Sequence, residues 1–332
     1  MKRNFDLSTT VIAPFIVGLV LPMAAGAQGG LLYETEAIAG SDIPVSYHLI
    51  ETDDGLFTPI GLRKPPGDGP FPIVLFASGN GGEGMRYVKD YSHNRGWTLE
   101  QFLDAGYAVA WMRYRAEVDL PVYDGTPLVD RAWSGRPRLS RAPFEYEDVI
   151  AIIEYVKTLP FVSADLVGYM GMSHGGEMLM KIASEYDGLR VGIASEPASA
   201  AFLARRELDA VAPAQRDVPE TAATYEEDKI GQEVRDLRGR LDMDVAMARL
   251  GRIEIPILVM GRNRDHNQFV FRLNYELLRE AGKDVEWATY DHDEHGFVYV
   301  QRNSTGVYAP NAVQRAAVAT AIAYFDRYMK GH

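Results

Sequence analysis

Residues 168–178 read GYMGMSHGGEM and hold one serine, Ser173, among glycines at positions 171, 175 and 176. An apolar run typical of a strand precedes this serine, and a helical segment follows it. The serine and its neighbours match the pattern G-x-S-x-G, in which a serine stands on a sharp turn between a strand and a helix. Glycines suit that turn because side chains would collide where strand and helix come close. The stretch therefore predicts either a plain turn or a raised nucleophile.

Short apolar runs alternate with helical segments on both sides of this turn. The predicted strands are 71–77, 107–112, 166–170, 191–195, 255–260 and 285–290, and the predicted helices are 97–105, 145–159, 177–186, 269–281 and 311–328. This alternation is typical of an α/β fold with a mainly parallel sheet and helices on both faces. Residues 197–251 are polar and helix-prone and contain no clear buried strand. We expect an insertion there, either a partial lid over the carboxyl ends of the strands or a cover for one side of the sheet.

Serine needs a base, and the base needs an acid that orients it. Asp265 follows the predicted strand 255–260, and His295 follows the predicted strand 285–290. Parallel strands place their carboxyl ends, where ligands bind, at one edge of the sheet. The chain order serine, aspartate, histidine is also that of a known class of hydrolases with a strand-to-helix nucleophile. The sequence thus predicts a catalytic triad of Ser173, Asp265 and His295.

Two of these assignments have a rival in the sequence. Glu196 follows the predicted strand 191–195 and is an alternative acid to Asp265. His292 competes with His295, but the glycine that follows His295 favours the latter. Residues 292–295, HDEH, lack the H-E-x-x-H spacing that presents two imidazoles on one helical face, so we expect no metal here and no cofactor.

An oxyanion hole requires backbone N–H groups that converge above the nucleophile. The first N–H of the helix after Ser173 belongs to His174, and the helix dipole adds positive potential there. The glycine-rich stretch 78–82, SGNGG, follows the predicted strand 71–77 and can supply a second donor. We expect the backbone N–H groups of His174 and Asn80 to form the hole.

The polar segment 113–141 contains six arginines in a chain whose net charge is −12. Such arginines commonly pair with surface carboxylates in solvent. The alternative is a clamp for a carboxylate or phosphate on the substrate, for which Arg113 and Arg138 are the candidates.

The composition excludes several classes of protein. With 47% hydrophobic and 24% charged residues, the chain has the composition of an ordinary globular protein. Its acidic balance argues against binding to a nucleic acid. The sequence contains no cysteine, which excludes disulfides, thiolate metal sites and a cysteine nucleophile. Nothing in the sequence indicates one oligomeric state over another.

The N-terminal residues look like a targeting segment. A basic start is followed by the apolar run 11–22 and by the small residues 25–27, AGA. These are the three parts of a secretory signal peptide, and the apolar run is shorter than the roughly 20 residues of a membrane span. We expect residues 1–27 to be removed, residues 28–332 to form a single domain without a stable membrane span, and the protein to be periplasmic or secreted.

Three stretches carry a resemblance to a known family: LPFVSADLVGYMGMSHGGEM (159–178), IPILVMGRNRDHN (255–267) and YDHDEHGF (290–297). In these stretches the chain resembles the α/β-hydrolase superfamily, specifically its dienelactone-hydrolase-like and prolyl-oligopeptidase-like branch. The resemblance implies an α/β-hydrolase fold over roughly residues 56–330 and a serine hydrolase. Dienelactone hydrolases use a cysteine that this chain lacks, and the segment 28–55 is too short for the propeller of prolyl oligopeptidases.

We therefore expect a secreted serine esterase that cleaves a small-molecule or short-chain carboxylic ester through an acyl-enzyme. A serine peptidase with the same triad is one alternative. A hydrolase-like binding protein that has lost catalysis is another.

Overall fold

The computed structural model describes residues 29–79, 83–114, 142–198, 203, 227–263 and 265–331. The expected signal peptide, Asn80 and Arg138 lie outside these residues. Within them, one nine-stranded sheet has the strand order β1-β2-β3-β5-β4-β6-β7-β8-β9. Its strands are β1 (Gly30–Glu36), β2 (Val45–Glu51), β3 (Phe57–Arg63), β4 (Phe71–Ala77), β5 (Ala108–Met112), β6 (Val162–Met172), β7 (Val191–Ser195), β8 (Ile257–Arg262) and β9 (Val285–Tyr290).

The sheet has a parallel part and an antiparallel extension. Strands β5, β4, β6, β7, β8 and β9 pair in parallel with their neighbours, whereas β1, β2 and β3 pair antiparallel, and β3 joins β5 antiparallel. The parallel strands are almost wholly apolar, as expected of strands covered on both faces. The predicted α/β fold with a mainly parallel sheet is confirmed. Since β6, β7, β8 and β9 are neighbours, their carboxyl ends form one continuous edge.

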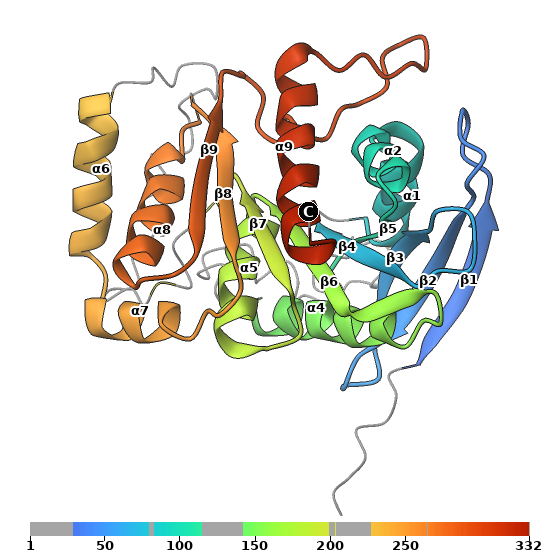
Figure 1. Ribbon diagram of the computed structural model, residues 1–332, viewed down its shortest axis with the longest axis horizontal. Coiled ribbons are helices and arrows are strands. Elements are labelled where there is room, and N and C mark those ends of the chain that lie inside the picture. The colour runs from blue at the N-terminus through green and yellow to red at the C-terminus, as the bar shows by residue number, and fades with distance from the viewer. Residues whose placement is uncertain are drawn as a thin grey trace, which may run out of the picture.

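Helices cover both faces of the sheet (Figure 1). The described helices are α1 (Met85–Asn94), α2 (Trp97–Asp104), α4 (Ala142–Lys157), α5 (His174–Glu185), α6 (Glu227–Gly239), α7 (Met243–Leu250), α8 (Gln268–Glu280) and α9 (Ala312–Met329). Apolar side chains of α1, α2 and α9 share one hydrophobic core, and those of α4 to α8 share the other. The two cores hold the sheet rigidly between them, which keeps the carboxyl ends of its strands in fixed positions.

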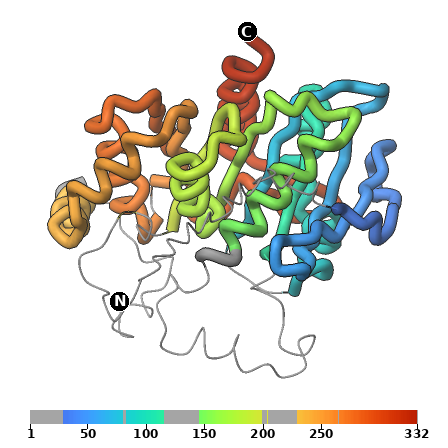
Figure 2. The backbone as a smooth tube through the Cα atoms, turned by 90° about the horizontal axis from the view of Figure 1, so that it is seen from below, coloured from blue at the N-terminus to red at the C-terminus, as the bar shows by residue number. Residues whose placement is uncertain are grey.

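The described part of the expected insertion lies at one end of the molecule. Apolar residues on α6, among them Ile230 and Val234, are buried in the same core as α8. Figure 2 shows α6 and α8 at the end opposite the blue N-terminal strands. Residues 199–202 and 204–226 lie outside the described residues, so the lid over the strand ends stays a prediction.

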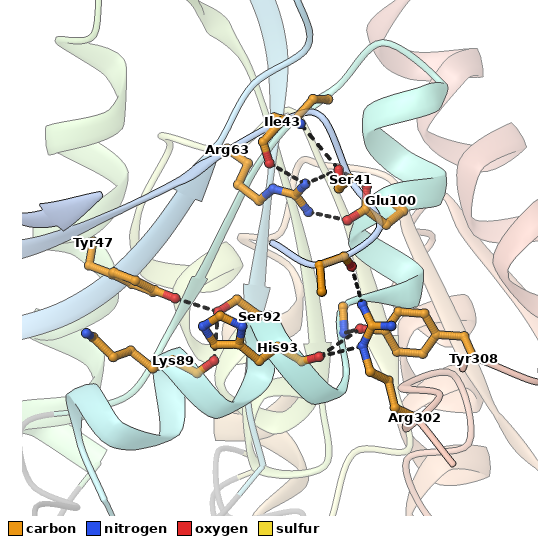
Figure 3. Close-up of polar contacts among 12 residues, drawn as sticks. Ser41, Ile43, Tyr47, Arg63, Lys89, Ser92, His93, Glu100, Arg302 and Tyr308 are labelled. Carbon is orange, nitrogen blue, oxygen red and sulfur yellow. Dashed lines mark hydrogen bonds and ion pairs between the residues drawn. The ribbon is translucent and has the colours of Figure 1, made fainter. Parts of the chain in front are cut away.

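A buried arginine attaches the antiparallel strands to the helices (Figure 3). The Arg63 guanidinium, at the end of β3, donates to Glu100 Oε1 of α2 at 2.5 Å. It also donates to Ser41 Oγ at 2.6 Å and to the Ile43 carbonyl oxygen at 2.7 Å, both on the turn between β1 and β2. One fully buried cation therefore joins β3, α2 and this turn, and its charge is balanced by one carboxylate.

A second group of contacts secures the same extension to α1 (Figure 3). The hydroxyls of Tyr47 on β2 and Ser92 on α1 lie 2.7 Å apart. The Arg302 guanidinium donates to the carbonyl oxygens of His93 and Ala39, each at 2.7 Å, and lies over the Tyr308 ring. The antiparallel strands are thus fixed to the rest of the fold at several points.

Candidate active site

Ser173 occupies the junction between β6 and α5 in a strained backbone conformation. Its φ of 55° and ψ of −114° are unusual for a residue with a side chain. Its N–H donates to the Ser195 carbonyl oxygen at 2.8 Å, and its own carbonyl oxygen accepts from the N–H groups of Gly176 and Ala198. These bonds hold the strained turn in place.

The glycines around Ser173 are required by close backbone contacts. A Cβ atom at Gly171 would lie 2.1 Å from the Gly175 carbonyl oxygen. A Cβ atom at Gly175 would lie 2.4 Å from the carbonyl oxygen of Ala77, the last residue of β4. Side chains at these two positions would force the strand and the helix apart, which is the physical reason for glycine there.

The loop after β4 reaches this turn. A Cβ atom at Gly79 would lie 3.2 Å from the Ser173 Cβ. Gly79, the last described residue before Asn80, therefore lies beside the serine. The backbone N–H of His174 is the first of α5, where the helix dipole is positive. The roles of His174 and Asn80 in an oxyanion hole stay predictions.

Arg113 is buried behind that loop. Its Nη1 donates to Ser78 Oγ and to the Gly79 carbonyl oxygen, both at 2.6 Å, and its guanidinium stacks 3.6 Å above the Tyr87 ring. The described contacts are all with the protein itself and would steady the loop. The substrate-clamp role predicted for Arg113 and Arg138 stays a prediction, and Arg138 lies outside the described residues.

The side chain of His174 lies between two carboxylates. Its Nε2 is 2.5 Å from Glu145 Oε2 on α4, and its Nδ1 contacts Glu177 Oε1 on α5. Burial alone would lower the pKa of His174, but its hydrogen bonds to the two glutamates override burial and raise it to about 10. The imidazolium therefore joins α4 to the first turn of the helix that follows Ser173.

Asp265 and His295 form a buried pair at the ends of β8 and β9. His295 Nδ1 lies 2.8 Å from Asp265 Oδ2, while Asp265 Oδ1 accepts from the N–H of Asn267. Burial opposes ionisation, yet the hydrogen bond and the charge of His295 lower the pKa of Asp265 to about 2. Burial likewise opposes protonation of His295, but the bond to Asp265 outweighs it and raises its pKa. A neutral imidazole that donates from Nδ1 to Asp265 keeps Nε2 free as a base.

The histidine loop adjoins the serine turn. A Cβ atom at Gly296, the residue after His295, would lie 3.3 Å from the Cε of Met172, the residue before Ser173. The structure therefore brings the predicted serine, acid and histidine to one edge of the sheet, on loops that are in contact.

Glu196, the alternative acid, lies beside the same imidazole. It follows β7, is fully buried, and has a positive φ of 48°. Its Oε1 is 3.8 Å from His295 Nδ1, a longer separation than the 2.8 Å of Asp265, and its Oε2 accepts from the Gly296 N–H at 2.6 Å. Burial is the main reason that its pKa is raised to about 7. The geometry thus favours Asp265 as the partner of His295 and gives Glu196 a different contact.

Arg262 completes this cluster and was not predicted from the sequence. It is fully buried at the end of β8, with its Nε 2.8 Å from Asp265 Oδ2 and 3.3 Å from Glu196 Oε1. A charged residue directly after an apolar run was interpreted as the start of a loop, because arginines are rarely buried. The signal that could have identified it is the pair of acids on neighbouring strand ends, since two buried carboxylates need a cation.

Glu196, Asp265 and His295 also have ligand atoms within 4.8 Å of one another, a spacing that a metal ion could use. The guanidinium of Arg262 already supplies a positive charge to both carboxylates. A metal dication in the same place would lie against that guanidinium and be repelled. We therefore interpret the cluster as an acid–base site.

The fold and this site define the class of the protein as an α/β-hydrolase. A model of the prolyl oligopeptidase family matches residues 92–332, which is more than half of the chain. The chain therefore belongs to the prolyl oligopeptidase family of serine hydrolases, in agreement with the resemblance found in the sequence.

Solved structures with the same fold include peptidases and esterases. Dipeptidyl peptidase 4 of Porphyromonas gingivalis has a TM-score of 0.58 at 17% identity, over 86% of this chain and 36% of that chain. An acylaminoacyl peptidase of Pyrococcus horikoshii has a TM-score of 0.53 at 13% identity, over 91% and 50%. An esterase from Rhizomucor miehei has a TM-score of 0.54 at 15% identity, over 91% and 86%. This chain thus spans half or less of either peptidase.

Among the helices of the described residues, none combines the length and the apolar character that crossing a membrane requires.

Proposed function

We propose that the chain is a serine esterase that cleaves a carboxylic ester through an acyl-enzyme. Ser173 is the nucleophile, His295 the general base and acid, and Asp265 the acid that orients the imidazole. The observation that carries this proposal is the buried Asp265–His295 pair, whose loop contacts the strained turn of Ser173. A carboxylate, an imidazole and a strained serine at one sheet edge are the parts that acyl transfer needs.

The proposed mechanism moves one proton forward and back. Ser173 Oγ attacks the ester carbonyl while His295 Nε2 takes the hydroxyl proton. The tetrahedral oxyanion is held by the N–H of His174 and by the loop after β4, and its collapse expels the alcohol, which receives the proton from His295. Water then attacks the acyl-enzyme with His295 again as base, and the acid product leaves. Asp265 stays ionised and stabilises the imidazolium in both halves of the cycle.

The nucleophile is tested by comparing two serines. Ser173→Ala should lower kcat for p-nitrophenyl esters by about a thousandfold or more and abolish labelling by a fluorophosphonate. Ser184→Ala, a buried serine eleven positions further along the chain in α5, is the matched control and should keep both. Wild-type esterase activity in Ser173→Ala would overturn the proposal.

The preference for esters over amides is the finer part of the proposal. Its support is that solved structures with this fold include the Rhizomucor miehei esterase, with a TM-score of 0.54. Paired assays with acyl p-nitrophenyl esters and aminoacyl p-nitroanilides measure this preference directly. A higher kcat/KM for the anilides would identify a peptidase, the second candidate, which the family match favours. Failure of the folded wild type to react with a fluorophosphonate would identify a binding protein instead.

We further propose that this hydrolase acts in the periplasm or outside the cell after loss of residues 1–27. The support is the tripartite pattern of the N-terminal sequence. Mass spectrometry of the protein recovered from a periplasmic fraction should give a chain that starts at Gln28.

A further inference from the structure

The cluster around His295 holds more negative than positive charge among its fixed groups. Two fully buried carboxylates, Asp265 and Glu196, face one fully buried guanidinium, Arg262. Burial of an unpaired charged group costs free energy. Each of these three side chains must therefore make contacts that offset this cost. A triad needs one acid, and Asp265 already fills that role, which leaves Glu196 and Arg262 to be explained.

Both residues bind the backbone of the histidine loop, one on each side of His295. Arg262 Nη1 donates to the carbonyl oxygen of Asp293, two residues before the histidine. Glu196 Oε2 accepts from the N–H of Gly296, one residue after it. Gly296 has a φ of 74°, so the chain turns sharply at this contact. The backbone of the histidine loop is therefore held on both sides of His295, and the imidazole is held by its hydrogen bond to Asp265.

The backbone of Glu196 has a strained conformation. Glu196 has one of the three positive φ values found in non-glycine residues of the described chain, and Ser173 has another. Both follow adjacent parallel strands, β7 and β6. Strained backbone conformations persist only where surrounding contacts hold them, and residues in such conformations cluster at functional sites.

We propose that Glu196 and Arg262 act as a pair of positioning residues that bracket His295, fix its loop against the serine turn and set the basicity of its imidazole with opposite signs. This inference rests on the proposed serine hydrolase function and deepens it. Neither side chain reacts with the substrate.

The opposite signs follow from the charges that face the imidazole. His295 lies beside the carboxylates of Asp265 and Glu196, near the guanidinium of Arg262, and 6.2 Å from the ring of His266. The negative charge of Glu196 raises the pKa of His295, and the positive charge of Arg262 lowers it. Burial raises the pKa of Tyr299 well above its usual range, and the negative charge of the nearby Glu196 adds to this effect.

The test compares Glu196→Gln, Arg262→Gln and the double variant with the wild type. The first readout is the pH at which the His295 imidazole titrates by NMR, and the second is the acid limb of kcat/KM. Glu196→Gln should shift both to lower pH, and Arg262→Gln should shift both to higher pH. The double variant should fall between them. We expect kcat to fall on the order of 10-fold to 100-fold in either single variant because the imidazole is displaced, with a smaller change in KM.

Two further variants separate charge from geometry and from folding. Arg262→Lys keeps the charge but loses the planar fork, so it should leave the His295 titration close to wild type while kcat falls. Glu100→Gln removes the carboxylate that pairs with the buried Arg63 and should change neither readout. If Arg262→Gln does not fold, comparison of the double variant with Glu196→Gln gives the effect of removing the Arg262 charge on the His295 titration.

The outcomes separate this inference from the proposed function. If the His295 titration shifts in the same direction in both single variants, or in neither, the proposed positioning of His295 by Glu196 and Arg262 is wrong. The proposed Ser173-dependent esterase activity would be unaffected by that result. A wild type that fails to react with esters or a fluorophosphonate would overturn the proposed function, and the NMR titration would still decide whether the bracket exists.

Discussion

Arg63 and Arg262 are two buried arginines of the same sheet with different surroundings. The side chain of Arg63 pairs with one glutamate, and the side chain of that glutamate, Glu100, is still 25% exposed. Its other partners are a serine hydroxyl and a backbone carbonyl. Arg262 instead faces two carboxylates that are fully buried and an imidazole beside them. Only the second cluster has two carboxyl groups for one guanidinium.

The difference shows that a buried charge alone does not mark a functional site. Arg63 joins strands and helices whose relative positions it maintains, and its charge is balanced. Around Arg262, two carboxyl groups share one guanidinium, and Ser173 and Glu196 nearby have strained backbone conformations. The pKa of Glu196 is raised and the pKa of Asp265 is lowered. Groups whose pKa values are driven apart in this way are typical of acid–base sites.

Substitution of one carboxylate in each cluster should separate the two roles most strongly. Asp265→Asn should lower kcat by about 10³-fold to 10⁴-fold because the imidazole loses its orienting acid. Glu100→Gln should leave kcat within about twofold and lower the free energy of unfolding by about 1–2 kcal/mol. Ester hydrolysis and urea unfolding of both variants provide the measurement. A large loss of kcat in Glu100→Gln would remove the distinction between the clusters.

Removal of the Arg63 cation should have the next largest effect, on stability and not on chemistry. Arg63→Met removes the guanidinium donor from Glu100, Ser41 and the Ile43 carbonyl. We expect a loss of about 2–3 kcal/mol, at the lower end for buried pairs because Glu100 is partly exposed. Urea unfolding measures the loss. The rate of ester hydrolysis divided by the concentration of active sites, titrated with a fluorophosphonate, should give an unchanged kcat.

The smallest expected effect is a change in how stability depends on pH. Burial raises the pKa of Glu196 from its ordinary value of 4.5 to about 7. An acid with a raised pKa in the folded state contributes stability below its ordinary pKa, and this contribution is lost as pH rises through the folded value. Relative to Glu196→Gln, the Tm of the wild type should therefore fall between pH 4.5 and pH 7.5. Parallel Tm curves for the two proteins over this range would contradict the prediction.

Much of the fold could be predicted because its determinants are local. The strands β4, β7 and β9 have the predicted bounds. Continuous apolar runs followed by polar residues define β4 and β7 clearly. The junction at Ser173 followed from the glycines, whose side chains would collide with the backbone. The neighbouring placement of Asp265 and His295 followed from the rule that parallel strands end at one edge.

Other features depend on contacts between distant residues and could not be predicted. The helix α1 was missed because only Val88, Tyr91 and Ser92 are buried along its ten residues, and its sequence is mostly polar. The strand β8 extends to Arg262, where a local pattern indicated a loop. Burial of Arg262 is favourable because Glu196, from the end of β7, joins Asp265, three residues further along the chain, beside the guanidinium. A pattern of neighbouring residues does not contain the contact with Glu196.

The backbone bonds of Ser173 have a consequence for how such a site can change over evolution. Its N–H binds the Ser195 carbonyl oxygen, and its carbonyl oxygen binds the Ala198 N–H, so the two strand ends form one unit that includes Glu196. An insertion or deletion within residues 195–198 would displace the serine itself. A change of substrate specificity is therefore expected to come from other parts of the chain, because this short turn holds the nucleophile in place.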